Sequence, residues 1–155
     1  TRDIVSKSLS LRQVSGIKVR QPLNLLRIKH IRDKSLEPYL RITQEEVNVK
    51  IVEIDPRFKE ELFLDTTITP GLQREGMIRE LIRTIQELRR DAGLKPMERA
   101  SVVADGLVGG LRDDEWEEVK RVCHLRLVEF GRIRGAVVER EVAFEEGTIT
   151  IGVKK

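Results

Sequence analysis

Cysteine and aromatic residues are scarce in this 155-residue sequence, and long apolar runs are absent. The single cysteine, Cys123, excludes a disulfide framework and a four-thiolate zinc site, and it fits a reducing, cytoplasmic compartment. Because aromatic residues make up only 4% of the chain, the core must consist mostly of valine, isoleucine and leucine. No apolar run approaches the ~20 residues that a membrane-spanning helix requires, so we expect no membrane partner.

A recognisable catalytic constellation is also missing. Cys123 and His124 are adjacent, but neighbouring residues on a helix face different directions, and the apolar pattern places Cys123 in the core. The acidic run 113–115 resembles a set of metal ligands, yet acidic residues are typical of a first helical turn, where they complement the helix dipole. His30 lies among basic residues, which favours solvation or a phosphate contact over catalysis. We therefore expect no catalytic centre, no metal and no cofactor in this chain.

Charge is distributed unevenly, although the net charge is only +3. Residues 1–34 carry nine basic and two acidic side chains, which gives +7, so the remaining 121 residues sum to −4. An imbalance of this kind indicates contact with a polyanion, most often nucleic acid. A basic face that meets only solvent is the alternative.

One transition occurs twice, 77 positions apart. Residues 15–23 read SGIKVRQPL and residues 92–100 read AGLKPMERA, each after a charged stretch with helical spacing. The glycines, Gly16 and Gly93, mark helix ends, because glycine enters the left-handed conformation there without steric cost. A second match, between KIVEI at Lys50 and RLVEF at Arg126, has an offset of 76. The two halves therefore represent one repeated unit.

Apolar periodicity gives both halves the same order of elements, helix, strand, helix, strand, strand, and the second half ends on one further strand. The first half is predicted to contain a helix over 2–14, a strand over 22–31, a helix capped by Ser35, and strands over 49–54 and 61–66. The second half is predicted to contain a helix capped by Thr69, a strand over 97–104, a helix opened by Asp114 and Glu117, and strands over 125–130, 136–144 and 147–153. We predict an α+β fold in which units 1–68 and 69–155 pack helices on antiparallel sheet and together form one compact domain.

Nucleic-acid binding is the function that the basic residues favour most. The candidate contacts of the first half gather around its first helix end: Arg12, Lys18, Arg20 and Gln21. The basic groups suit phosphates, and the glutamine amide suits a base edge. The long helix of the second half carries a basic stripe of Arg79, Arg83 and Arg90. Nearby glutamates make a salt-bridged solvent face an equally good interpretation of that stripe. The scarcity of aromatics argues against a base-stacking platform, so binding should be electrostatic and salt-sensitive.

Residues 64–94, LDTTITPGLQREGMIRELIRTIQELRRDAGL, resemble the C-terminal region of isoleucyl-tRNA synthetase of the eukaryote-like type, which lacks a C-terminal zinc module. The segment 15–23 is similar to the place where the last helix of that family's anticodon-binding bundle enters the C-terminal appendage, so residues 1–20 resemble the end of the bundle. Gly71 departs from the family pattern, which usually has glutamate there.

The resemblance implies a piece of a class I ligase that joins isoleucine to its tRNA with ATP and Mg²⁺. The family's ATP-handling signatures, HIGH and KMSKS, are absent from this sequence. We therefore expect a non-catalytic appendage that helps hold the anticodon arm of isoleucine tRNA, beside the remainder of the synthetase. The alternative is a structural or docking module without tRNA affinity, whose apolar face along residues 4–14 would favour a homodimer.

Overall fold

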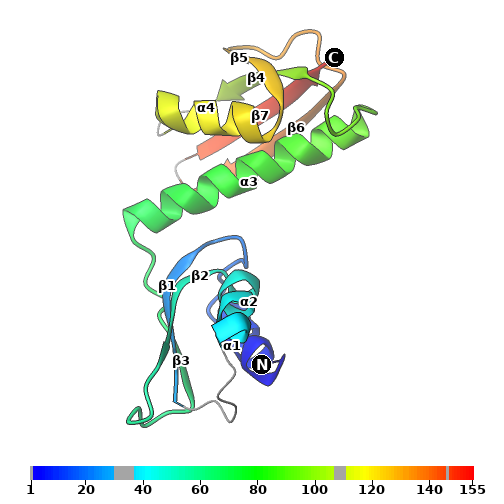
Figure 1. Cartoon of the computed structure of the whole chain (residues 1–155). Helices are drawn as coiled ribbons and strands as arrows, with labels where there is room; N and C mark the ends of the chain where they lie inside the picture. The colour runs from blue at the N-terminus through cyan, green and yellow to red at the C-terminus, as the bar shows by residue number, and fades with distance from the viewer. Residues whose placement is uncertain (1, 30–36, 107–110, 146) are drawn as a thin grey trace. The chain divides into compact units, whose positions relative to one another are not determined.

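The computed structural model describes residues 2–29, 37–106, 111–145 and 147–155, with the backbone alone at Glu37. His30 and Ser35, both named in the sequence interpretation, lie outside the described residues. The fold class is α+β, as predicted, with helices packed on sheets (Figure 1). Contacts divide the chain into a first unit, residues 1–76, and a second unit, residues 77–155. The boundary thus falls inside the long helix, eight residues after the predicted position of 68/69.

The first unit consists of two helices on one face of a three-stranded sheet (Figure 1). Its elements are α1 (Arg2–Val14), β1 (Leu23–Ile28), α2 (Glu37–Val47), β2 (Val49–Ile54) and β3 (Leu62–Leu64), followed by the start of α3 (Pro70–Asp91). The strand order is β2-β1-β3. The core between helices and sheet comprises Val5, Leu23, Leu26, Ile28, Val47, Val49 and Leu64.

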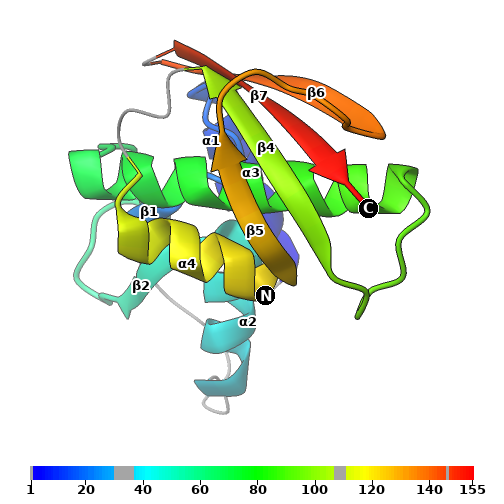
Figure 2. The same ribbon diagram turned by 90° about the horizontal axis from the view of Figure 1, so that it is seen from above.

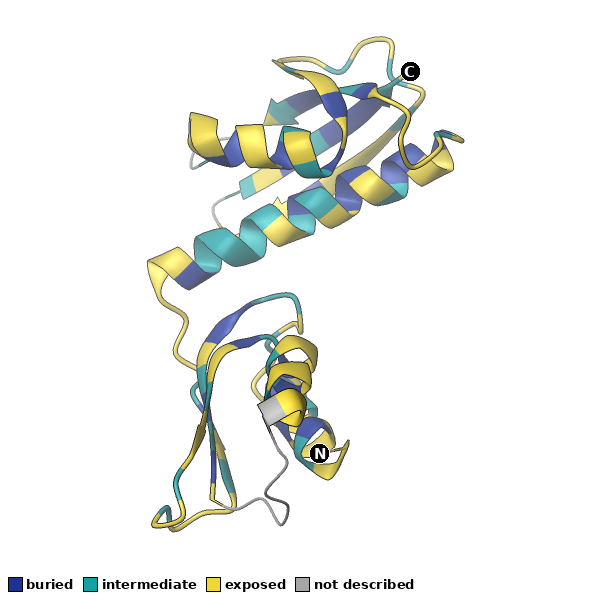
Figure 3. Cartoon of the chain, viewed as in Figure 1, coloured by how far each residue is buried: buried dark blue, intermediate teal, exposed yellow. Residues whose placement is uncertain are grey.

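The second unit packs the rest of α3 and a shorter helix on a four-stranded sheet. Its further elements are β4 (Ala100–Gly106), α4 (Asp113–Val122), β5 (Leu125–Phe130), β6 (Val138–Phe144) and β7 (Gly147–Lys154). The strand order is β5-β4-β7-β6, and Figure 2 shows the strands crossing α3. The α3 side chains Leu81, Ile85 and Leu88 are fully buried in this core. Figure 3 shows buried and exposed residues alternating along α3.

The sheets are mixed rather than purely antiparallel, which corrects one part of the predicted fold. β1 runs parallel to β2, and β4 runs parallel to β5. Each pair is joined by a helix, and a helical crossover brings the chain back to the end of the sheet where it started. In both units a later strand, β3 or β7, then pairs antiparallel with the first strand on its other side.

The sequence repeat is thus confirmed as a repeat of topology. Gly16 and Gly93 both take the left-handed conformation after the first helix of their unit, with φ of 68° and 74°. A second repeated position was not predicted: Asn48 and His124, directly before β2 and β5, have φ of 56° and 53°. The Thr69 cap is also confirmed, since its Oγ1 accepts a hydrogen bond of 3.2 Å from the N–H of Leu72.

A buried arginine holds the end of the first helix in the first unit. The side chain of Arg12 is only 1% exposed. Its Nη1 donates to the carbonyls of Lys18 and Gln21, at 3.1 and 2.8 Å, in the turn between α1 and β1. Its Nε and Nη2 donate to the carbonyls of Val47 and Asn48, both at 2.8 Å, where α2 ends. One guanidinium therefore joins two chain segments that the sequence separates by about 30 residues.

Arg89 occupies the equivalent position in the second unit, 77 residues later. It is 6% exposed, and its Nη2 lies within hydrogen-bond distance of the carbonyls of Lys95, Pro96 and Glu98, at 3.1, 3.2 and 2.6 Å. Its Nη1 is buried and has no hydrogen-bond partner among the described residues. Both arginines therefore bind the turn that follows glycine, and Arg12 makes the fuller set of bonds.

Replacement of Arg12 should cost more stability than replacement of an exposed arginine. Arg12→Met would leave buried carbonyls without donors, so we expect the free energy of unfolding to fall by about 3 kcal/mol or more. Arg89→Met should cost less, because all three of its bonds come from one nitrogen. Arg41→Met on the exposed face of α2 is the matched control and should change stability by no more than about 0.5 kcal/mol.

Urea unfolding followed by circular dichroism measures these differences. Fluorescence of Trp116, which lies in the core of the second unit, reports on the Arg89 variant separately. Equal unfolding midpoints for Arg12→Met and Arg41→Met would contradict the role of the buried guanidinium.

Candidate nucleic-acid interface

Two of the predicted contact residues use their side-chain donors to hold the fold: Arg12, which is buried, and Gln21, which is half-buried. Arg12 is buried, and burial lowers the pKa of its guanidinium to about 10, which still leaves it charged at neutral pH. Gln21 donates from Nε2 to the carbonyls of Pro22 and Leu72, at 3.0 and 2.6 Å, and so ties the start of β1 to the first turn of α3. Gly76 makes room for it, since a Cβ there would lie 2.3 Å from Oε1 of Gln21. Burial removes Arg12 from the candidate contacts, whereas a contact by Gln21 stays a prediction and would require it to give up these two hydrogen bonds.

Lys18 and Arg20 remain on the turn between α1 and β1. Lys18 is exposed and makes no ion pair with a described residue, whereas Arg20 is half-buried and has an interaction partner. The backbone of this turn is fixed, because Arg12 binds its carbonyls and Asn48 Nδ2 donates to the Val19 carbonyl at 2.8 Å. The turn therefore presents cationic side chains from a backbone that needs little ordering.

Ion pairs neutralise part of the basic excess at the start of the chain. Lys7 pairs with Asp3 at 3.0 Å and with Glu61 at 2.9 Å. Arg27 pairs with Glu53 at 2.8 Å, and its guanidinium also lies 5.5 Å from the centre of the Phe58 ring. Two further basic residues, at positions 32 and 34, lie outside the described residues. The charge count of the sequence thus overstates the free positive charge of this surface.

The basic stripe on α3 is partly a salt-bridged face. Arg83 pairs with Glu80 at 3.6 Å and with Glu87 at 2.7 Å, as the alternative interpretation expected. Glu87 also accepts from Arg140 on β6, at 2.6 Å.

The other two arginines of the stripe are exposed. Arg79 has an interaction partner, whereas Arg90 makes no ion pair with a described residue. Arg90 is therefore an exposed charge on this helix without an ion pair to a described residue.

The acidic run at 113–115 caps a helix. The three residues form the first turn of α4, and the Glu115 carboxylate accepts from the Arg112 N–H at 2.8 Å. The capping pair is thus Arg112 and Glu115, two positions before the predicted Asp114 and Glu117. No group of three His, Cys, Asp or Glu residues in the described part of the chain is arranged to hold a metal.

Cys123 is buried in the core of the second unit, which confirms the structural interpretation. It is 1% exposed and belongs to the same cluster as Trp116 and Val119. His124, in contrast, is exposed. Burial raises the pKa of the Cys123 thiol to about 11, while the charge of Arg89 opposes this effect. Of the helices that the structure describes, none is long and apolar enough to cross a membrane.

Curated proteins that resemble this chain carry one name, isoleucine–tRNA ligase. The protein from Methanoculleus marisnigri is 41% identical over 61 residues, which cover 37% of this chain and 6% of the relative. The protein from Leifsonia xyli is 24% identical over an alignment that covers 99% of this chain and 21% of the relative. A third, from Methanocorpusculum labreanum, is 54% identical over 33 residues, or 21% of this chain and 3% of the relative.

The chain spans about a fifth or less of the length of these relatives. No protein-family model matches it. The comparisons relate the chain to a part of a tRNA synthetase, while the C-terminal location and the eukaryote-like type stay predictions.

The Cys123 thiol should be inert in the folded chain. Its folded pKa of about 11 lies above the ordinary 9.0, so folding reduces the thiolate fraction, and this difference adds stability that is lost as pH rises between the two values. At about pH 8 the thiolate fraction should be about a hundredfold lower in the folded than in the unfolded chain. We expect a disulfide reagent such as DTNB to label the chain in denaturant but not in buffer. Rapid labelling in buffer would contradict the burial.

Proposed function

We propose that this chain is a non-catalytic appendage of an isoleucine–tRNA ligase that helps hold the anticodon arm of isoleucine tRNA. The observation that carries the proposal is the turn after α1, where Lys18 and Arg20 extend from a backbone that Arg12 holds. The similarity to isoleucine–tRNA ligases suggests which polyanion such a turn would bind, namely tRNA. In this proposal the chain is the C-terminal region of an enzyme of the eukaryote-like type.

The turn would act on the phosphate backbone of the tRNA. Lysine and arginine side chains neutralise phosphates without reading sequence, so they position the RNA and leave base recognition to other groups. Because the turn carbonyls are already bonded to Arg12, little conformational entropy is lost when the side chains bind. Arg90 on α3 is a second accessible contact, while Arg83 would first have to leave its glutamate partners.

The remainder of the synthetase is the other partner in this proposal. It would bind ATP, Mg²⁺ and isoleucine, since the described residues of this chain form no metal cluster and the sequence lacks the ATP signatures. The cytoplasm is the compartment that we propose for this function.

A docking module without tRNA affinity is the second candidate, and exposed apolar side chains favour it. Leu11, Val14 and Val19 near the end of α1 are 38%, 84% and 48% exposed. They lie beside the cationic turn, so a protein partner would cover the same region. A self-associating chain with no affinity for tRNA would support this candidate.

Salt-dependent binding of tRNA tests the proposal. In fluorescence anisotropy, the wild-type chain should bind isoleucine tRNA, and its affinity should fall steeply between about 50 and 200 mM salt. Lys18→Ala should weaken binding severalfold and reduce the slope of log K against log salt by about 0.7–0.9, the value of one phosphate contact. Arg41→Ala, which removes an exposed charge from α2, is the control and should leave both quantities unchanged.

Two results would count against the proposal. If Lys18→Ala matched the wild type, Lys18 would not be a contact. If the wild-type chain failed to bind any tRNA even at the lowest salt, the docking module would be the better account.

A further inference from the structure

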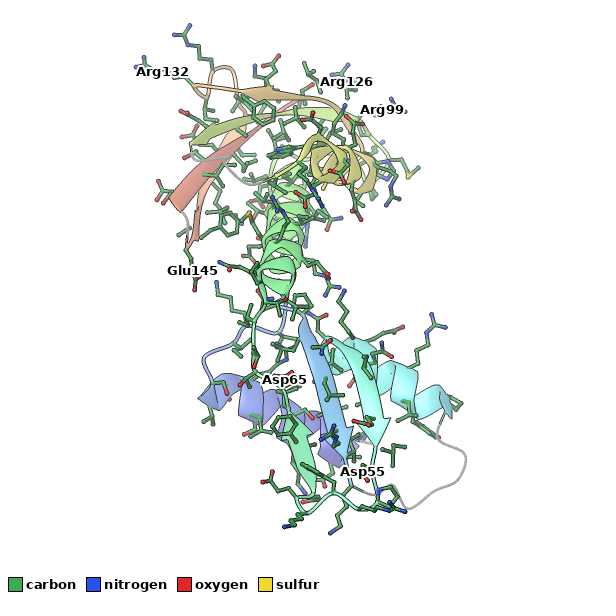
Figure 4. All side chains as sticks on the ribbon, turned by 90° about the vertical axis from the view of Figure 1, so that its left-hand side faces the viewer. Asp55, Asp65, Arg99, Arg126, Arg132 and Glu145 are labelled. Carbon is green, nitrogen blue, oxygen red and sulfur yellow. The ribbon has the colours of Figure 1, made fainter. Side chains whose placement is uncertain are left out.

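The amino ends of β4 and β5 form a basic edge on the second unit, which sequence reasoning did not identify. It consists of four exposed residues: Lys95, Arg99, His124 and Arg126. No ion pair joins any of them to a described residue. In Figure 4 the labelled side chains of Arg99 and Arg126 extend from the same end of the sheet, whereas Arg132 lies apart from them.

Strand pairing brings these residues together. Ala100 on β4 is the partner of Leu125 on β5, and the Ala100 N–H donates to the His124 carbonyl at 3.3 Å. Arg99 and His124 therefore flank the first paired position. Parallel strands lie about 5 Å apart, so side chains from both can reach neighbouring groups on one ligand.

Arg126 occupies an irregular position in this ladder. The pairing continues from Ala100 with Leu125 to Ser101 with Leu127, so Arg126 has no partner on β4. An extra residue of this kind bends the strand and redirects a side chain, and such irregularities are frequent at functional edges.

The turn before β4 is fixed in the same way as the turn before β1. Arg89 binds the carbonyls of Lys95, Pro96 and Glu98 from inside the unit. Glu98 is the only acidic residue between Gly93 and Ala100, and its carboxylate accepts from the Lys95 N–H at 3.1 Å. The acid thus takes part in the turn, and no ion pair with Lys95 or Arg99 is formed.

The repeat shows how the two units differ at this edge. Lys95 is the counterpart of Lys18, at an offset of 77, and Arg126 is the counterpart of Lys50, at an offset of 76. Lys50 pairs with Glu75 at 2.5 Å, whereas Arg126 makes no ion pair with a described residue. Among the described residues, the second unit therefore leaves unpaired a positive charge that the first unit neutralises.

We propose that the basic edge formed by Lys95, Arg99, His124 and Arg126 is a second phosphate-binding surface, which contacts the sugar-phosphate backbone of RNA. The inference rests on the proposed function. Arginine forks match phosphate oxygens bidentately, and two of them lie close in the fold here, Arg99 directly before β4 and Arg126 on the adjacent strand β5. The four side chains of the basic edge include no phenylalanine, tyrosine or tryptophan on which a base could stack, so their contribution is independent of sequence.

The double variant Arg99→Ala/Arg126→Ala tests this surface in the 155-residue chain. Arg132→Ala is the matched control, because it removes an exposed arginine beyond the carboxyl end of β5. We expect the double variant to bind both isoleucine tRNA and a non-cognate tRNA about tenfold or more weakly at about 0.1 M salt, with the salt slope reduced by about 1.4–1.8. Arg132→Ala should stay within about twofold of the wild type.

Several outcomes would overturn the inference. If the double variant binds like the wild type while Lys18→Ala loses affinity, the basic edge is not a contact and the proposed function stands. A loss for one tRNA alone would indicate base readout instead of phosphate binding. Unchanged affinity with new self-association in sedimentation would show that Arg126 only protects an edge strand. Absence of all tRNA binding by the wild-type chain would overturn both proposals.

Discussion

The bond between a buried guanidinium and the carbonyls of a glycine-ended turn is the interaction on which each unit depends. A helix end leaves backbone carbonyls without hydrogen-bond donors, and the turn that begins with Gly-Ile-Lys or Gly-Leu-Lys contains further carbonyls that need donors. Arg12 and Arg89 supply those donors from inside the unit. Burying a charge is costly, but several hydrogen bonds to backbone oxygens offset that cost and fix where the first strand begins. The sequence motif around Gly16 and Gly93 is what the repeat makes easy to see. The arginine four residues before each glycine makes the hydrogen bonds that hold the turn.

The same device connects the fold to the proposed function. By drawing the turn carbonyls inward, each arginine holds a short loop in one conformation, with cationic side chains such as Lys18 and Lys95 on its outer side. The two turns are related by the repeat, yet their surroundings have diverged. In the first unit Lys50 is neutralised by Glu75, and the exposed apolar residue Val19 lies on the turn itself. In the second unit Arg126 makes no ion pair with a described residue. A duplicated fold has thus kept one internal interaction and varied the charge around it.

Much of the fold follows from local sequence patterns. The helix over 2–14 and the strands over 49–54 and 125–130 have the predicted bounds, because their apolar residues recur at clear helical or strand spacing. The direction of strand pairing depends on how helices cross over, which periodicity does not report. The candidate site was harder to predict, because the burial of an arginine depends on which distant segments pack against it. Arg12 and Gln21 look like surface residues until Val47, Asn48 and Leu72 are brought against them. One signal was present: Arg12 aligns with Arg89 across the repeat, four residues before the repeated glycine in each unit.

Amide chemical shifts of the isotope-labelled chain, recorded as the anticodon arm of isoleucine tRNA is added, test the central claim most directly. The account predicts that the largest changes fall on the two arginine-held turns, at residues 17–21 and 95–99, and on the neighbouring residues 124–126. Changes confined to the uncovered face of the first sheet, where Ile51 and Phe63 are 53% and 40% exposed, would contradict it. Absence of any change at low salt would contradict it as well.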